Sequence, residues 1–189
     1  MLNILRRMKL WQKFATLGVL GAVIASIPTV QLIQRQNSEL DVARSEQSGI
    51  DPVRTLVALQ KQLQAHRGLA SMVLSGNTAA DTDRRARQAD VNTQFSALGK
   101  AVAERGWKQA ADEAQAMKTQ WEQLARKVDE RSISAKDSFE AHNGLVERNI
   151  HLIEMVADTS GLTLDPVAES YFVMTAAIDF LPRAAESVS

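Results

Sequence analysis

Apolar residues recur at intervals of three and four positions along most of the chain beyond residue 52. This spacing places them on one face of an α-helix, because the helix has 3.6 residues per turn. The predicted stripes are Leu56, Leu59, Leu63, His66, Ala70 and Val73; Val91, Phe95, Leu98 and Val102; Ala114, Met117, Trp121, Leu124 and Val128; and Phe139, His142 or Asn143, Val146, Ile150, Ile153 and Ala157. No stretch of comparable length alternates with the period of two that a strand shows. The pattern therefore predicts an all-α fold.

Turn-forming residues divide these stripes into helices joined by short connections. Gly76, Gly106 and Gly161 each follow a stripe, and Ser134 with Asp137 has the form of an N-terminal capping box. We expect a first helix that includes the apolar segment described below and ends near residue 46. Further helices are expected near residues 52–75, 80–105, 108–130, 135–160 and 167–187. Because short connections make neighbouring helices antiparallel, the body is predicted to be an antiparallel, four-helix-type bundle.

Residues 14–34, FATLGVLGAVIASIPTVQLIQ, carry no formal charge. A helix of this length covers about 30 Å, the thickness of the hydrocarbon core of a bilayer. A signal peptide usually has a shorter apolar core and a cleavage site of small residues, and a buried helix of a small domain is seldom apolar on all sides. We therefore predict one transmembrane helix at residues 14–34, and no later stretch is long enough to form a second.

Basic residues lie on only one side of this apolar segment. Residues 1–13 contain four basic residues and no acidic residue, whereas acidic and basic residues are mixed after the segment. The positive-inside rule then places residues 1–13 in the cytoplasm. Residues 35–189 are expected to form a periplasmic region anchored by a single span in the bacterial inner membrane.

Small residues recur every four positions within the apolar segment, at Gly18, Ala22 and Ser26. Such a stripe lets two membrane helices approach closely, so a homodimer contact is one interpretation. The other is that small residues are simply common in membrane helices. Pro28, near the outer end of the segment, is expected to bend the helix and loosen its last turns.

Charge and composition exclude several classes of function. Residues 35–189 contain 18 basic and 22 acidic residues, so no basic surface is expected for nucleic acid. The absence of cysteine and the presence of only three histidines disfavour a metal site, and no cofactor is expected. No phosphate-binding loop, dinucleotide-binding turn, zinc-protease motif or nucleophile elbow occurs, so no enzymatic activity is expected. Arg84, Arg85 and Arg87 alternate with aspartates and are expected to form a solvated face.

Two polar groups interrupt the apolar stripes. His66 lies on one of them with Arg67 beside it, and His142 and Asn143 lie on another with Arg148 further along. One interpretation is a pocket for a small anion, in which Arg67 and Arg148 donate paired hydrogen bonds to a carboxylate. The other is that the histidines are hydrogen-bonded core residues, while the arginines reach solvent or pair with Glu147 and Glu154.

Four stretches of the chain resemble the N-terminal part of bacterial methyl-accepting chemotaxis proteins. They are MLNILRRMKLWQKFATLGVLGAV, LQKQLQAHRGLASMVLSGN, SFEAHNGLVERNIHLIEMVADTSGLTLDP and ESYFVMTAAIDFLPRAAE. Similar sensor regions occur on some membrane-bound histidine kinases and diguanylate cyclases. The sequence departs from the family where Val167 and Ala168 replace an aspartate-rich continuation.

This resemblance implies a homodimeric receptor whose periplasmic bundle binds a small molecule and signals by displacement of a helix. The sensing residues that it implies are His66, Arg67, Gly68, Asn143 and Tyr171. The sequence ends at Ser189 before a second span or an output domain, so we expect a truncated sensor region.

Two function hypotheses follow from the sequence. The first is a membrane-anchored, chemoreceptor-like sensor for a small ligand, with organic acids among the candidates. The second is an anchored structural or adaptor protein whose helices bind partner helices and no small molecule. The sensor region of a histidine kinase or diguanylate cyclase is a variant of the first hypothesis.

Overall fold

The computed structural model describes residues 9–164 and residue 184. In this part of the chain the α-helices are α2 (Leu10–Leu74), α3 (Asp81–Glu104), α4 (Lys108–Asp129) and α5 (Ala135–Ser160), with 3₁₀ turns η1 (Thr78–Ala80) and η2 (Leu162–Leu164). The described residues contain no strand, which confirms the all-α prediction for them. The expected last helix, near residues 167–187, lies outside the described residues apart from residue 184.

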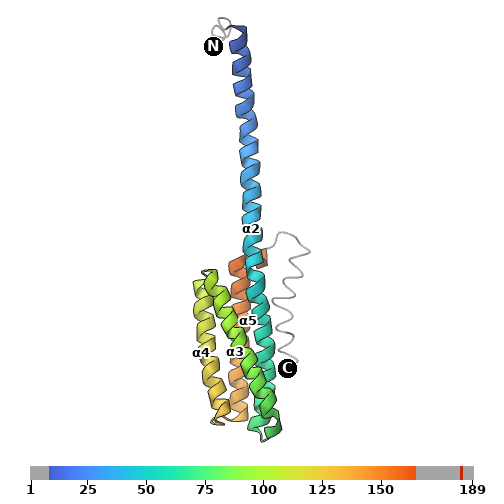
Figure 1. The fold of residues 1–189 in the computed structure, drawn as a ribbon, viewed down its shortest axis with the longest axis vertical. Coiled ribbons are helices and arrows are strands. Elements are labelled where there is room, and N and C mark those ends of the chain that lie inside the picture. Colours follow the sequence, from blue (N-terminus) through green and yellow to red (C-terminus); the bar gives the residue numbers. More distant parts are fainter. Residues whose placement is uncertain (1–8, 165–183, 185–189) are drawn as a thin grey trace. The chain divides into compact units, whose positions relative to one another are not determined.

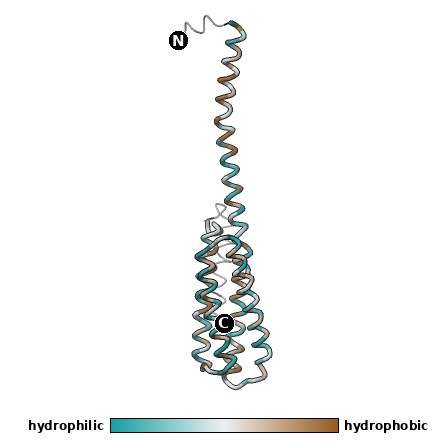
Figure 2. Tube along the Cα trace, turned by 60° about the vertical axis from the view of Figure 1, so that its left-hand side comes forward, coloured by the Kyte–Doolittle hydropathy of each residue, from teal (hydrophilic) through white to brown (hydrophobic). Residues whose placement is uncertain are grey.

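The chain divides into two compact units, Met1–Arg44 and Ser45–Ser189. The first contains the N-terminal part of α2, which includes the predicted transmembrane segment. An 18-residue window of this helix has a mean hydropathy of 1.8 and none of it is buried, so by length and composition the helix could span a membrane. Figure 2 shows its apolar residues giving way to polar ones along the helix.

Hydroxyl side chains within the apolar segment make their hydrogen bonds inside the helix. The hydroxyl groups of Ser26 and Thr29 donate to the carbonyl oxygens of Val23 and Ala25, each at 2.8 Å. This pattern suits a hydrocarbon environment, where every polar group needs a partner within the protein. The helix continues through Pro28 instead of ending there.

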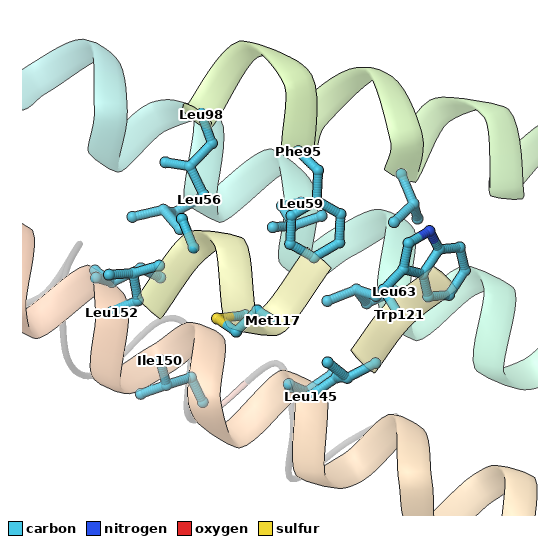
Figure 3. Close-up of a cluster of buried hydrophobic side chains, with 14 of the residues drawn as sticks. Leu56, Leu59, Leu63, Phe95, Leu98, Met117, Trp121, Leu145, Ile150 and Leu152 are labelled. Carbon is cyan, nitrogen blue, oxygen red and sulfur yellow. The ribbon is translucent and has the colours of Figure 1, made fainter. Parts of the chain in front are cut away.

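In the second unit, the rest of α2 packs side by side with α3, α4 and α5 around one apolar core (Figure 1). Each helix contributes one face, as the periodicity predicts, and Figure 3 shows the central residues. They are Leu56, Leu59 and Leu63 of α2, Phe95 and Leu98 of α3, Met117 and Trp121 of α4, and Leu145, Ile150 and Leu152 of α5. One predicted core residue differs: Phe139 is 39% exposed.

The predicted turn chemistry is present at the helix ends. Gly76, Gly106 and Gly161 all have positive φ, which residues with a Cβ atom rarely adopt. The Ser134 hydroxyl oxygen accepts the amide hydrogen of Asp137 at 3.0 Å, which confirms the cap of α5.

One expected boundary is wrong. The sequence predicts a break between about residue 46 and Pro52, but α2 is a single helix across this region. Proline lacks an amide hydrogen and so deprives the carbonyl four residues earlier of its helical partner. Here that carbonyl, of Ser48, accepts a hydrogen bond from the Arg105 side chain at 2.6 Å. A residue from α3 thus compensates the loss, which local sequence rules cannot foresee.

Candidate functional site

Two histidines from different helices form a fully buried pair. His66 of α2 and His142 of α5 are both 0% exposed, and Nδ1 of His66 lies 2.8 Å from Nε2 of His142. Nδ1 of His142 lies 2.6 Å from the carbonyl oxygen of Ser138. Since a carbonyl only accepts, His142 carries its proton on Nδ1, and its Nε2 accepts the Nδ1 proton of His66. The His142 ring is therefore neutral in this arrangement.

Burial is the main reason why these histidines stay neutral. It lowers the pKa of His66 from 6.5 to about 3, helped by the neighbouring His142 and Arg84. Burial likewise lowers the pKa of His142 to about 4; the hydrogen bond to the Ser138 carbonyl opposes this change, and the charge of Arg67 adds to it. At neutral pH the pair adds no positive charge to the core.

Aromatic and amide groups complete the surroundings of the pair. The Trp121 ring of α4 meets the His66 ring edge-on, with centroids 4.8 Å apart, and donates its Nε1 hydrogen to Asn92 of α3 at 2.8 Å. Within the described residues, Nε2 of His66 has no hydrogen-bond partner, although Gln88 lies near enough to oppose the fall in its pKa. All four helices thus meet at the level of the histidines.

Arg67 and Asn143, the residues that follow His66 and His142, form another contact between α2 and α5. Arg67 is only 2% exposed, and its Nη1 donates to Oδ1 of Asn143. Its guanidinium lies over the Phe139 ring, with Cζ 4.7 Å from the centroid. Phe139 therefore contacts Arg67 although it lies outside the apolar core. The prediction that Arg67 and Asn143 share a site is consistent with this geometry, and the structure places the cation between two residues of α5.

A second arginine is buried where the sequence predicted a solvated face. Arg84 is 1% exposed and donates to Asp81 and Asp129, each at 2.8 Å, and to Gln88 at 2.6 Å. The expectation is therefore wrong for Arg84, whereas Arg85 and Arg87 are exposed. Arg84 precedes Val91 by seven residues and so shares its buried face. The seven-residue spacing from Val91 indicates burial of Arg84, but the alternating charges around it favoured the prediction of a solvated face.

Other predicted site residues do not join this group. Arg148 bonds to Glu113 and Gln120 of α4, with its Nη2 2.7 Å from the Glu113 carboxylate, so it pairs with an acidic residue of a neighbouring helix. Gly68 is exposed, and a Cβ atom added there would meet no neighbouring atom. Tyr171 lies outside the described residues.

The described residues contain no group of three or more histidine, cysteine, aspartate or glutamate side chains that could hold a metal ion. The charged groups of the core are instead arginines, of which Arg84 is neutralised by two aspartates. Arg67 contacts an amide oxygen and an aromatic ring.

Comparison with known proteins supports a sensor. No curated protein and no solved structure matches the chain. Residues 58–183 match a family described as nitrate and nitrite sensing, whose members are periplasmic sensor regions of signalling proteins. The match covers well over half of the sequence and includes the His66–His142 and Arg67–Asn143 contacts. It supports the predicted class of sensor but does not single out chemotaxis proteins. The chain belongs to the nitrate- and nitrite-sensing family.

Proposed function

We propose that the protein is the membrane-anchored sensor portion of a chemoreceptor-like transducer, and that it binds nitrate or nitrite beside Arg67. The family match supports the ligand class. The observation that carries the site is the buried guanidinium of Arg67, held against Asn143 and Phe139 of α5. In this role the protein binds its ligand and does not transform it.

The chemistry of the group fits a small planar oxyanion. A guanidinium presents parallel N–H donors in a plane, which matches two oxygen atoms of nitrate or nitrite. Phe139 covers one face of the Arg67 guanidinium, so an anion is expected at its edge. The Asn143 side chain carries two N–H donors on its amide nitrogen, and these are available chemically to the same anion. Because the histidine pair is neutral, the positive charge where α2 faces α5 comes from Arg67 of α2.

The proposed signal is a displacement of α2 relative to α5. An anion held between these helices stabilises whichever helix arrangement binds it better, and so shifts the population of the two arrangements. The same helix, α2, contains Arg67 and the apolar segment. We propose that residues 14–34 span the bacterial inner membrane, with residues 1–13 in the cytoplasm and the sensor in the periplasm. The stripe of Gly18, Ala22 and Ser26 is proposed as a homodimer contact.

Binding is tested with the full chain in lipid nanodiscs. Sodium nitrate at a hundred times its Kd should stabilise the folded protein by about 2.7 kcal/mol, which thermal unfolding detects. Sodium chloride at equal concentration controls for ionic strength. Arg67→Lys keeps the charge but loses the paired donors, so its nitrate affinity should fall at least about tenfold.

Arg54 offers a matched control on the same helix. Its side chain is 77% exposed and pairs only loosely with Asp51 among the described contacts, at 3.5 Å. Arg54→Lys should bind nitrate like the natural protein. A folded natural protein whose melting temperature responds to neither nitrate nor nitrite would contradict the proposal and favour the structural or adaptor function.

A further inference from the structure

Pro52 lies inside α2, on its buried side. Its ring nitrogen carries no hydrogen, so the carbonyl of Ser48, four residues earlier, has no donor within the helix. A carbonyl without a donor in a partly buried position is unfavourable. The backbone of α2 therefore contains one acceptor that another part of the protein must satisfy.

Arg105, at the end of α3, donates the hydrogen bond that the Ser48 carbonyl needs. Arg105 is the C-cap residue of α3, and its Nε donates to the Ser48 carbonyl at 2.6 Å. Its Nη1 donates to the Ala101 carbonyl in the last turn of α3 at 2.8 Å. The guanidinium also lies over the Trp107 ring, 5.8 Å from the centroid, just before α4 begins. One side chain thus joins α2 to the end of α3 and to the α3–α4 connection.

The neighbouring residue of α2 is held from a second side. Gly49 is buried, and a Cβ atom added to it would lie 2.2 Å from Oγ of Ser160, at the end of α5, and 2.7 Å from Leu162 of η2. Glycine is required here because the backbone of α2 touches α5 directly. Over residues 48–52 the helix is therefore fixed by α3 and by α5 at the same level.

We propose that Ser48, Pro52 and Arg105 form a latch that couples the position of α2 to the α3–α4 connection. A normal hydrogen bond within a helix moves with that helix and does not depend on the positions of neighbouring helices. By removing the internal donor, Pro52 makes the Ser48 carbonyl depend on α3, so that any sliding of α2 past α3 breaks this bond. The latch itself follows from these contacts alone; its part in signalling rests on the proposed sensor function.

A double-mutant cycle tests the latch in the full chain in nanodiscs. Arg105→Gln should lower the melting temperature by about 5 °C when Pro52 is present, because a charge-assisted bond to a carbonyl is lost. In the Pro52→Ala background an amide returns to the Ser48 carbonyl, so the same change should cost less than half as much. Arg54→Gln is the control and should show no such dependence on residue 52. An equal loss from Arg105→Gln in both backgrounds would overturn the latch.

Two further outcomes are decisive. If Arg105→Gln alone fails to fold, Pro52→Ala should restore folding, and failure of the double variant would also overturn the proposal. Coupling to the ligand is measured by hydrogen exchange of residues 45–52 with and without sodium nitrate. Arg105→Gln should bind nitrate within about twofold of the natural affinity but lose the nitrate-dependent change in exchange; retention of that change refutes the signalling role. If nitrate does not bind at all, the thermal cycle still decides whether the latch exists.

Discussion

The neutral histidine pair predicts a loss of stability in mild acid. Both histidines have folded pKa values well below the ordinary 6.5, at about 3 for His66 and about 4 for His142. In mild acid only the unfolded chain binds these two protons. A depressed histidine pKa therefore contributes full stability above pH 6.5, and this contribution falls as the pH drops below that value.

The magnitude follows from the unfolded state. At about pH 5, both folded pKa values lie below the pH and the unfolded value of 6.5 lies above it. Proton binding to the unfolded chain then favours unfolding by about 2 kcal/mol for each histidine, or about 4 kcal/mol for the pair. The positive charges of Arg84 and Arg67, which lie near the pair, oppose protonation of the folded form.

The assay compares thermal unfolding at about pH 7.5 and about pH 5 for the natural chain and for His66→Gln/His142→Gln, followed by circular dichroism in nanodiscs. The natural protein should lose about 10 °C more than the double variant between the two conditions, because glutamine hydrogen-bonds but does not titrate. His151→Gln is the control, since His151 is exposed and pairs with Glu154 on its own helix. Equal pH dependence in natural and double-variant chains would refute the buried neutral pair.

Two other substitutions test the packing of the core. Arg84→Gln removes the donors to Asp81 and Asp129 and should lower the free energy of unfolding by about 2–3 kcal/mol. The control Arg85→Gln changes an exposed side chain and should lower it by less than about 1 kcal/mol. Denaturant titration measures both values, and equal losses would contradict the burial of Arg84. Gly49→Ala places a methyl group against Ser160 and should cost about 1–3 kcal/mol by thermal unfolding. Gly99→Ala, at an open position of α3, should instead stabilise by up to about 1 kcal/mol, so a neutral Gly49→Ala would contradict the close contact.

The sequence predicted the helices well because their signals are local. Stripes such as Val91, Phe95 and Leu98 repeat with the period of the helix, and all three residues are buried. Glycines at positive φ mark three helix ends, and Ser134 caps α5. Each of these features depends on residues within one or two turns of one another. Periodicity and capping are therefore sufficient to place them.

Partners on different helices could not be predicted in the same way. The His66–His142 and Arg67–Asn143 contacts both join residues 76 positions apart, and their pairing depends on how far α2 is shifted along α5. A shift of one turn would replace both partners. The stripes identified His66, His142 and Asn143 as polar groups on apolar faces, with Arg67 beside His66, but only the structure shows which of them meet.

The continuity of α2 also depends on a residue that is distant in the sequence. A proline near position 52 is ordinarily read as a helix start, and that rule failed because Arg105, 53 residues further along, satisfies the carbonyl that Pro52 leaves without a donor. The buried position of Arg84 was hidden for a related reason. Its aspartate partners, Asp81 and Asp129, come from two helices, and only one of them is near in sequence.

The most direct measurement of the central claim is an experimental structure of the chain determined in sodium nitrate. The account predicts a trigonal anion between α2 and α5, within hydrogen-bond distance of the Arg67 guanidinium and next to Asn143, with the neutral histidine pair intact beside it. An anion bound elsewhere in the chain, with only protein groups around Arg67, would contradict it.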